Sequence, residues 1–467
     1  MIKIFSFFVI LFFFLSVPQS FASEKNPEIL VDGYKIEKYV TDLNVPIAID
    51  FIDSDMFILQ KNDGMIHLIQ NGKLKEQPIL DLEVSNYGEQ GLLGITTVGN
   101  KIYLFFTEAF HDGGLSHGNK IYEYTWDGEK ISNKKLIKLL PGWTESYNGG
   151  AMAHDLKNRI FAVSGSQFTF GALQNTPLDE SARCFTEGIC DDKDKITFSD
   201  SIEKTLSCVN VSFRHYTTNP FGWQTEQPER SDNPFETNPF NVVINLNSCL
   251  QAFIFHNFSN GDWRDIGVVL QVKPPIDSYH AIGIRNSFGI TSDPITGNLW
   301  MTDNGPDKFD EINLVEKKFN GGWAKIIGNI NDAQLTPTSH YEDFVYSDPE
   351  FSWELPIGIT ALDFADSQLF TKHDGWLFVT DSNHGNIYYF ELNKERNGFE
   401  FESRHLKDLI VNIDPENTHG NFHESMSEIM FGTNFGLVTD LKFGPDGALY
   451  VVSLLDGTIY RISPNFV

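Results

Sequence analysis

The sequence of 467 residues has few basic residues, few cysteines and no low-complexity tract. Lys and Arg number 35 against 63 Asp and Glu, which gives a formal net charge of -28. This shortage of positive charge argues against nucleic acid as a partner, because binding to phosphates requires a basic surface. We interpret the excess of acidic residues as a contribution to solubility. An apolar content of 41% is ample for a packed core.

After its first residues the chain has no apolar run long enough to cross a membrane, since a spanning helix needs about 20 residues. The N-terminus has Lys3, an apolar run over residues 4–17 and the small-residue sequence Ser20-Phe21-Ala22. This order predicts a signal peptide over residues 1–22 and a protein that is secreted or exported to a periplasm-like space. An uncleaved membrane anchor is the alternative.

Only four cysteines are present, and all lie in one stretch: Cys184, Cys190, Cys208 and Cys249. An even number in an exported chain indicates two disulfides, for which three connectivities are possible. Paired C-x-x-C elements are missing, which argues against a zinc site. Free thiols are the other alternative.

The chain also lacks the H-E-x-x-H motif and the P-loop, so helix-borne zinc hydrolysis and P-loop nucleotide chemistry are not expected. Its histidines are scattered, and a lone histidine is more often structural than a ligand. Those considered are His154, His280, His384, His419 and His423.

One pattern recurs six times along the chain. The last copy, Gly436–Ile462, consists of three alternating strands separated by a Pro-Asp-Gly turn and an Asp-Gly turn. The earlier copies begin at Pro46, Gly91, Gly149, Phe288 and Ile359. One such sheet cannot cover its own apolar faces, whereas six sheets around an axis can. The repeats therefore predict an all-β fold, a six-bladed β-propeller over residues 30–467, with separate β-sandwiches as the alternative.

The third copy is interrupted by an insertion of about residues 168–265, and its outer strand is placed at Gly267. The insertion contains every cysteine and a run rich in Pro and Asn. We interpret it as a disulfide-containing cap over one mouth of the propeller, or as a loop-rich subdomain used for dimerisation.

The segment from Arg285 to Trp323 concentrates polar groups. Arg285-Asn286 offers a cation beside an amide, the Gly305-Pro306 turn can expose adjacent carbonyls, and Asp310-Glu311 adds carboxylates. Carbonyl and carboxylate oxygens are the ligands that Ca²⁺ prefers. The segment therefore predicts a calcium site that involves Gly305, Pro306, Asp310 and Glu311.

With its closing Gly321-Gly322-Trp323 and with the element Glu89-Gln90-Gly91-Leu92-Leu93-Gly94, this segment resembles the signature of the glucose/sorbosone dehydrogenase family. Its members are secreted six-bladed propellers that bind pyrroloquinoline quinone (PQQ) and calcium and oxidise aldoses. The resemblance implies a quinone position at Glu89, Asn148, Arg285 and Asn286. It also implies that the Gly305 and Pro306 carbonyls hold the Ca²⁺ of the cofactor, and that Asp310 and Glu311 bind structural calcium.

The chain departs from the family at the proton-accepting position. Where the family has a histidine before Asn-Gly-Gly, this chain has Tyr147, and the supporting aspartate corresponds to Ser166. A phenol is a poor general base at neutral pH, because it keeps its proton up to about pH 10. Both members of the family's catalytic pair are therefore substituted.

The cations that hold the quinone in the family are depleted as well. Two arginines correspond to Leu437 and Thr439, and a lysine corresponds to Asn383 or His384. PQQ is a tricarboxylate, and each lost charge-assisted hydrogen bond removes about 1.5–3 kcal/mol. The substitutions predict PQQ binding that is weaker by several orders of magnitude.

Three functions remain open at this point. The first is an exported PQQ- and calcium-dependent aldose dehydrogenase-like oxidoreductase with substituted base and clamp positions. The second is a non-catalytic extracellular propeller of the same descent that binds a glycan or a protein. The third is a lactonase-type hydrolase with Ca²⁺ on the propeller axis. Calcium is expected in the first and third, and a sugar or glycan is the expected ligand of the first two.

Overall fold

The computed structural model describes residues 26–140, 142, 145–165, 280–323, 326–329, 344–412 and 426–465, together with the backbone of four strands between residues 211 and 268. The predicted signal peptide, the four cysteines, Ser166, His419 and His423 lie outside the described residues, as does almost all of the predicted cap. In the described part the regular structure is nearly all strand, with one 3₁₀ turn, η2 (Arg404–Leu406). None of the described residues forms a helix of the length and apolarity that a membrane crossing requires.

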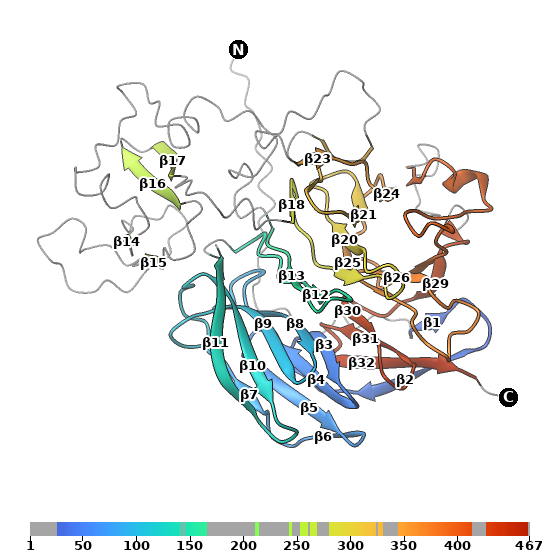
Figure 1. The fold of residues 1–467 in the computed structure, drawn as a ribbon, viewed down its shortest axis with the longest axis horizontal. Coiled ribbons are helices and arrows are strands. Elements are labelled where there is room, and N and C mark those ends of the chain that lie inside the picture. The colour runs from blue at the N-terminus through green and yellow to red at the C-terminus, as the bar shows by residue number, and fades with distance from the viewer. Residues whose placement is uncertain are drawn as a thin grey trace, which may run out of the picture.

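The strands form mainly antiparallel sheets arranged around a common centre, as the ribbon in Figure 1 shows. The first sheet comprises β3 (Pro46–Ile52), β4 (Asp55–Gln60), β5 (Met65–Gln70), β6 (Lys73–Leu74) and β7 (Leu80–Asp81). The second comprises β8 (Leu92–Val98), β9 (Lys101–Thr107), β10 (Asn119–Trp126) and β11 (Ile131–Leu140). A two-stranded pair follows, β12 (Met152–His154) and β13 (Ile160–Ala162).

Two further pairs lie in the region of the predicted insertion: β14 (Val211–Phe213) with β15 (Val242–Ile244), and β16 (Phe253–Ser259) with β17 (Asp262–Val268). The fourth unit is a sheet of β19 (Ile290–Ser292), β20 (Leu299–Asp303), β21 (Asp310–Val315), β24 (Phe351–Trp353) and β28 (Ile410–Val411). Beside it, three short parallel strands pair: β18 (Ala281–Ile282), β22 (Phe319–Asn320) and β23 (Val345–Tyr346).

The fifth sheet comprises β25 (Ile359–Phe364), β26 (Leu377–Asp381), β27 (Ile387–Phe390), β29 (Met430–Thr433) and β1 (Glu28–Ile29). The last comprises β30 (Val438–Phe443), β31 (Leu449–Ser453), β32 (Thr458–Pro464) and β2 (Tyr34–Val40). Here the N-terminal strand β2 pairs antiparallel with the C-terminal strand β32, with Glu37 opposite Arg461. The last sheet along the chain is therefore completed by the N-terminal strand β2.

The first strands of these units contact one another in a closed circle, β3 to β8, β12, β19, β25 and β30 and back to β3. This arrangement confirms the all-β propeller expected from the repeats. Five of the units are sheets of four or five strands, and β12–β13 is a two-stranded pair within the described residues. The number of six complete blades therefore stays a proposal.

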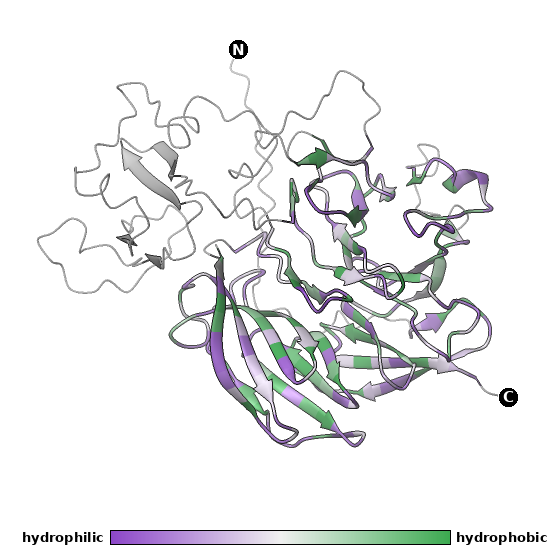
Figure 2. Ribbon diagram, in the orientation of Figure 1, coloured by the Kyte–Doolittle hydropathy of each residue, from purple (hydrophilic) through white to green (hydrophobic). Residues whose placement is uncertain are grey.

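Apolar side chains fill the spaces between neighbouring sheets. Phe57 and Leu68 of the first sheet pack with Ile95 and Leu104 of the second, and all four are buried. Figure 2 shows the matching pattern, with hydrophobic and hydrophilic residues in alternating bands along the outer strands β10 and β11. Since burial of a large apolar side chain contributes about 1.5–3 kcal/mol, these layers hold the ring of sheets together.

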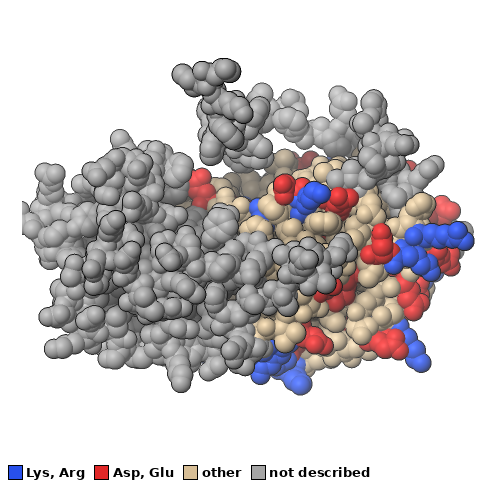
Figure 3. Space-filling model, turned by 90° about the horizontal axis from the view of Figure 1, so that it is seen from above, with Lys and Arg blue, Asp and Glu red and all other residues tan. Residues whose placement is uncertain are grey.

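On the face seen in Figure 3, acidic and basic side chains alternate around the described surface and do not gather into one patch of single sign. The excess of negative charge is thus spread over this face. This distribution agrees with a role of the charge in solubility.

Candidate functional site

A cavity of about 290 Å³, called the axial cavity below, lies where the first strands of several units (β8, β12, β19 and β25) begin and where β20 and β26 end. Antiparallel neighbours bring these strand ends to the same side of the ring. Its lining comes from several sheets and includes Glu89, Ser146, Tyr147, Arg285, Asn286, Phe288, Asn304, Gly305, Asp310, Pro356, Gly358 and Asn383. The structure thus brings together six of the residues singled out from the sequence, Glu89, Tyr147, Arg285, Asn286, Gly305 and Asp310, and also Asn383.

The backbone of Arg285 and Asn286 is fixed by Asp303, the last residue of β20. The two carboxylate oxygens of Asp303 accept hydrogen bonds from the backbone N–H of Arg285 (2.8 Å) and of Asn286 (2.7 Å). Burial raises the pKa of Asp303 to about 6, although these two N–H groups oppose the shift. Asp303 therefore acts as a positioning residue. It was not predicted from the sequence, because it lies 17 residues from its partner Asn286.

The Arg285 guanidinium is held on several sides. Its Nη1 donates to the carbonyl oxygens of Asn304 (2.8 Å) and Gly305 (3.1 Å), and its Nη2 donates to the hydroxyl of Tyr147 (3.1 Å). The guanidinium carbon lies 4.9 Å from the centre of the Tyr147 ring and 5.5 Å from that of Trp323. Such cation–π contacts add to the hydrogen bonds. Tyr147, at the position that the resemblance assigns to a base, thus contacts a cation in this structure.

Tyr147 reaches this position on an unusual backbone, with φ of 63°. The loop that carries it, residues 147–150, packs tightly against β8. A Cβ atom at Gly94 would lie only 1.9 Å from the carbonyl oxygen of Gly150, so the close approach requires glycine at position 94. The glycines on both sides of this contact therefore set where Tyr147 stands.

Glu89 lies beside this loop. Its Oε2 accepts a hydrogen bond from the backbone N–H of Asn148 (3.1 Å), and its Oε1 accepts one from Nδ2 of Asn286 (3.2 Å). Burial raises the pKa of Glu89, and these hydrogen bonds oppose the shift. The side chain of Asn148 is buried, and its Oδ1 accepts from Asn119 (3.1 Å). Glu89, Asn148 and Asn286 thus form one connected polar network.

Lys61, which follows β4, was also not predicted from the sequence. Its ammonium group donates to the carbonyl oxygens of Gly88 (2.8 Å) and Gln90 (2.6 Å), which flank Glu89. Burial lowers the pKa of Lys61 to about 8, and the nearby Glu89 opposes this shift. Lys61 therefore shapes the turn that presents Glu89, and no local pattern in the sequence links the two residues.

The predicted metal ligands have N–H partners in this structure. Asp310 is buried, and its Oδ1 accepts a hydrogen bond from the backbone N–H of Gly305 (2.9 Å). Its Oδ2 accepts from three consecutive backbone N–H groups, those of Ile357 (2.8 Å), Gly358 (2.7 Å) and Ile359 (3.1 Å). Burial raises the pKa of Asp310, and the four hydrogen bonds oppose the shift. Asp310 thereby ties the Gly305 turn to the start of β25.

Glu311 is buried on the opposite face of β21, where it stands across from Asp303 on β20. Its carboxylate accepts from the backbone N–H of Gly328 (2.5 Å) and from Nδ2 of Asn313 (3.3 Å). Burial and the negative charge of Asp303 raise the pKa of Glu311 to about 8. Pro306 is exposed and outside the cavity lining.

No group of three or more His, Cys, Asp or Glu side chains suited to a metal occurs among the described residues. In addition, the Gly305 carbonyl predicted as a calcium ligand already accepts from the Arg285 guanidinium. The assignment of calcium to Gly305, Pro306, Asp310 and Glu311 stays a prediction.

The charge of the cavity does not fit the PQQ tricarboxylate. Among the described lining residues Arg285 is the one cation, against the carboxylates of Glu89 and Asp310. Leu437 and Thr439, at the positions that the resemblance assigns to arginines, are not part of the lining. Thr439 donates to the Pro46 carbonyl (3.5 Å), and the Leu437 carbonyl accepts from the backbone N–H of Leu454 (2.8 Å). The three carboxylates of PQQ would therefore face one cation, Arg285, whose guanidinium already donates hydrogen bonds to Tyr147, Asn304 and Gly305.

A polar cluster on the inner strands was not anticipated. The ammonium group of Lys442 on β30 faces the carboxylates of Asp50 on β3, Asp363 on β25 and Asp440 on β30. Burial disfavours the charged form, but Asp363, Asp50 and Asp440 together raise the pKa of Lys442. Burial raises the pKa of Asp440 to about 7 despite the opposing charge of Lys442.

The same carboxylates join neighbouring inner strands. Asp440 accepts from the backbone N–H of Ile49 (2.8 Å), and Asp363 accepts from the backbone N–H of Phe443 (2.9 Å) and from the Thr291 hydroxyl (3.0 Å). A signal exists in the sequence, because Asp50-Phe51, Asp363-Phe364 and Lys442-Phe443 repeat a charged residue before phenylalanine in three copies.

The segment Gly114-Leu115-Ser116-His117-Gly118 matches the G-x-S-x-G pattern of serine hydrolases. In the structure it lies in the loop between β9 and β10, where no helix follows. The Ser116 hydroxyl is buried, donates to the Gly142 carbonyl (2.5 Å) and accepts from the Gly118 N–H (3.0 Å). Ser116 is therefore a structural residue of the loop.

Comparison with known proteins finds similarity to sugar dehydrogenases over part of the chain. Residues 270–461 match the family described as Glucose / Sorbosone dehydrogenase. The aldose sugar dehydrogenase YliI of Escherichia coli (strain K12) is 24% identical over 186 residues, which cover 39% of this chain and 43% of that protein. An uncharacterized protein of Synechocystis is 26% identical over 189 residues, 39% of this chain and 37% of that protein. Over this part of its length the chain is therefore similar to the glucose/sorbosone dehydrogenase family, at low sequence identity.

The matched segments span less than half the length of these curated relatives. Solved structures agree with the fold. The apo-form of the soluble aldose sugar dehydrogenase of Escherichia coli has a TM-score of 0.54 at 17% identity and covers 92% of this chain and 100% of that chain. The PQQ-bound aldose sugar dehydrogenase of Streptomyces coelicolor has a TM-score of 0.51 at 14% identity, with 94% and 100% covered. At such identities the likeness establishes the fold alone.

Proposed function

We propose that this protein is a sugar-binding propeller of the glucose/sorbosone dehydrogenase family whose axial cavity takes a sugar or glycan without PQQ. The observation that carries the proposal is the arrangement of Arg285, which is committed to Tyr147, Asn304 and Gly305 at the place where the family holds its cofactor. A neutral ligand requires no further cation.

The lining supports a polyhydroxylated ligand. The side chains of Asn286, Asn304 and Asn383 offer amide groups, and Glu89 offers a carboxylate, at the edge of a cavity of about 290 Å³. Sugar hydroxyl groups act both as donors and as acceptors, so they match amides and carboxylates better than a trianion does. The cavity lies at the lower end of the range for ligand sites, which begins at about 300 Å³, and so suits a small ligand.

A PQQ- and calcium-dependent aldose dehydrogenase is the second candidate, and the family match favours it. The gathering of Glu89, Tyr147, Arg285, Asn286 and Gly305 around one cavity agrees with the positions that the resemblance implies. In this case Glu89, Asn148, Arg285 and Asn286 would hold the cofactor, and Gly305, Pro306, Asp310 and Glu311 would supply calcium ligands. The substituted positions Tyr147 and Ser166 leave this candidate without the family's proton acceptor.

The remaining expectations complete the proposal. Residues 1–22 direct export, about residues 168–265 form a cap with two disulfides, and the β12–β13 pair is the inner half of the third of six blades. In an exported protein such a cap would limit which glycans enter the cavity.

The test is a titration of the purified full-length protein with PQQ, Ca²⁺ and aldoses. We expect an aldose to raise the melting temperature in the presence of EDTA, with no change in quinone absorbance and no reduction of an acceptor dye. Micromolar binding of PQQ together with aldose-dependent dye reduction would overturn the proposal and select the dehydrogenase. Hydrolysis of a lactone only in the presence of Ca²⁺ would select the lactonase-type alternative.

A further inference from the structure

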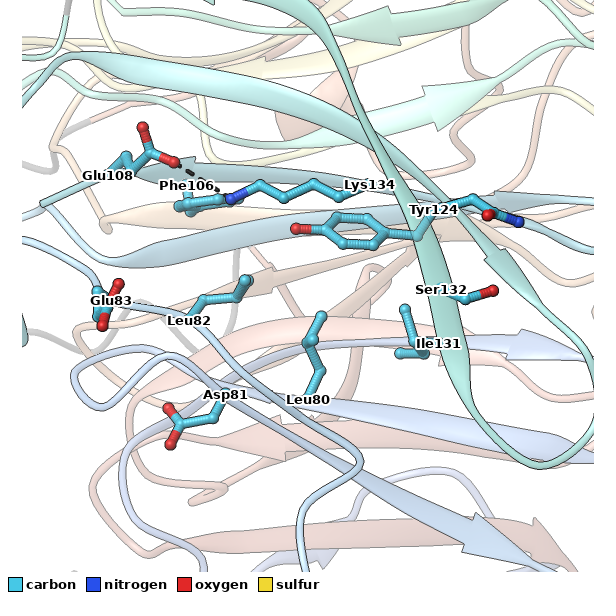
Figure 4. A pocket seen from close by; sticks show the side chains of 11 residues that line it. Leu80, Asp81, Leu82, Glu83, Phe106, Glu108, Tyr124, Ile131, Ser132 and Lys134 are labelled. Carbon is cyan, nitrogen blue, oxygen red and sulfur yellow. Dashed lines mark hydrogen bonds and ion pairs between the residues drawn. The ribbon is translucent and has the colours of Figure 1, made fainter. Parts of the chain in front are cut away.

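A second cavity, of about 350 Å³, lies between the outer strands of the first two sheets and shares no residue with the axial cavity. Figure 4 shows it between β7 with the segment that follows, on one side, and β10 with β11, on the other. Its lining consists of Leu80, Asp81, Leu82, Glu83, Phe106, Glu108, Tyr124, Ile131, Ser132, Asn133 and Lys134. The proposed function does not use any of these residues.

The floor of this cavity is apolar and mostly aliphatic. Leu80, Leu82 and Ile131 project into it, as Figure 4 shows, and they pack against the buried cluster between the two sheets. The rings of Phe106 and Tyr124 are 1% and 3% exposed, so neither offers an open aromatic face. A sugar ring, which stacks on exposed aromatic faces, is therefore poorly matched, whereas an apolar body is well matched.

The hydroxyl of Tyr124 indicates that this cavity can hold a ligand. Its hydroxyl is buried and has no hydrogen-bond partner among the described residues. In Figure 4 this hydroxyl extends from β10 toward the space between Lys134, Leu80 and Leu82. Because an unpaired buried hydroxyl is unfavourable, a hydrogen-bonding group in the cavity would complete it.

The charges of the wall divide into two groups. Glu108 forms ion pairs with Lys120 and with Lys134 (3.3 Å), and it accepts from the Tyr122 hydroxyl (2.9 Å). The ammonium group of Lys134 also lies 4.2 Å from the centre of the Tyr122 ring. These charges are engaged with one another and are not available to a ligand.

The second group consists of Asp81 and Glu83, which are exposed at the rim. No hydrogen bond or ion pair of either carboxylate occurs within the described part of the chain. Both lie in a protein with a formal net charge of -28, which raises the local concentration of cations. The rim therefore favours a positive group.

We propose that this cavity binds a small amphipathic organic cation. Its apolar body would rest on Leu80, Leu82 and Ile131, its ammonium group would lie at the rim within the negative field of Glu83 and Asp81, and a hydroxyl at the other end would reach the Tyr124 hydroxyl. An anion of the same shape is disfavoured by the two carboxylates.

Tyramine is a suitable probe, because it joins a phenol to an ammonium group through an apolar body. Its binding to the full-length protein is to be measured by calorimetry, beside two relatives. Phenethylamine lacks the hydroxyl, and phloretate has a carboxylate in place of the ammonium group. We expect tyramine to bind most tightly, phenethylamine about tenfold more weakly, and phloretate not to bind, as the loss of one charge-assisted or buried hydrogen bond predicts.

Variants locate the binding. Asp81→Asn with Glu83→Gln should weaken both amines about tenfold or more, and the effect should shrink at high salt. Tyr124→Phe should weaken tyramine to the level of phenethylamine and leave phenethylamine unchanged. Glu76→Gln, an exposed acid that follows β6 outside the cavity, serves as the matched control and should change neither affinity. The melting temperature of each variant verifies that it folds.

Equal binding of phloretate and tyramine would overturn the proposal, as would tyramine binding that is unaffected by all of these cavity variants. The outcome is independent of the axial cavity. Arg285→Ala, which alters the sugar site, should leave tyramine binding unchanged, so failure of one proposal can be distinguished from failure of the other.

Discussion

The Nη2 atom of Arg285 donates a hydrogen bond to the Tyr147 hydroxyl at 3.1 Å, and the guanidinium carbon lies 4.9 Å from the centre of the same ring. The pair joins the loop before β12 to the loop before β19. It puts a phenol at the position that the family resemblance assigns to a proton acceptor. The hydroxyl of Tyr147 and the guanidinium of Arg285 are each a partner of the other.

The first prediction concerns this pair. Tyr147→Phe removes the hydroxyl and keeps the ring, so Arg285 loses one hydrogen bond and retains its cation–π contact. We expect the free energy of unfolding to fall by about 1 kcal/mol, as measured by urea denaturation. Tyr147→Leu, which removes both contacts, should cost more. Equal stabilities of the two variants would show that the ring contributes nothing.

The second prediction concerns Asp310. Asp310→Ala leaves four backbone N–H groups without their acceptor, those of Gly305, Ile357, Gly358 and Ile359. We expect a loss of about 3–5 kcal/mol in the free energy of unfolding, because each orphaned buried group is costly. Its size should be the same in EDTA and in Ca²⁺.

Asp307→Ala, three residues earlier and exposed, is the control and should change the stability little. If the loss in Asp310→Ala instead appeared only in the presence of Ca²⁺, Asp310 would be a calcium ligand, and the structural role described above would be wrong.

The third prediction concerns pH. Folding raises the pKa of Asp303 to about 6, of Asp440 to about 7 and of Glu311 to about 8, in each case mainly through burial. Between the unfolded values near 4 and these folded values, the native state binds more protons than the unfolded state. Stability therefore falls as pH rises through this window.

We expect the free energy of unfolding to be higher at pH 5.5 than at pH 8.5, by up to about 6 kcal/mol if all three groups titrate as described. Glu311→Gln removes one of the titrating groups, so its stability should decline less over the same range. A stability that rises toward pH 8.5 in the unmodified protein would contradict the assignment.

The fourth prediction concerns the cluster on the inner strands. Lys442→Met leaves the carboxylates of Asp50, Asp363 and Asp440 facing one another without a cation. Breaking a buried charge group in this way costs about 3–5 kcal/mol. Urea denaturation should show this loss at pH 8 and a smaller one at pH 5, where Asp440 can hold a proton. Lys372→Met, on the exposed surface, is the control.

Much of the fold could be predicted from the sequence, because alternation of apolar residues and turn-forming Pro, Asp and Gly are local signals. Strands β30, β31 and β32 occupy the last repeat, Gly436–Ile462, as expected. The pairing of β2 with β32 was not predicted, since it joins residues at opposite ends of the chain.

The candidate site could be predicted only in part. Family motifs gave Glu89, Tyr147 and Arg285, and the structure places all three around one cavity. What the sequence did not reveal was the set of their partners. Asp310 accepts from N–H groups 47 to 49 residues away, and Lys61 donates to carbonyls 27 and 29 residues away. Such contacts depend on tertiary structure, so no local sequence pattern predicts them.

The pairing of β2 with β32 also has a consequence for how the ring is assembled. Until the C-terminal strand has been synthesised, β2 has no partner on this side, and the N-terminal sheet edge stays open to other chains. The ring can close only after the whole chain has been made. A chain shortened before Thr458 would lose β32 and leave two unpaired edges, so nascent or truncated forms should depend on chaperones and aggregate more readily than the finished protein.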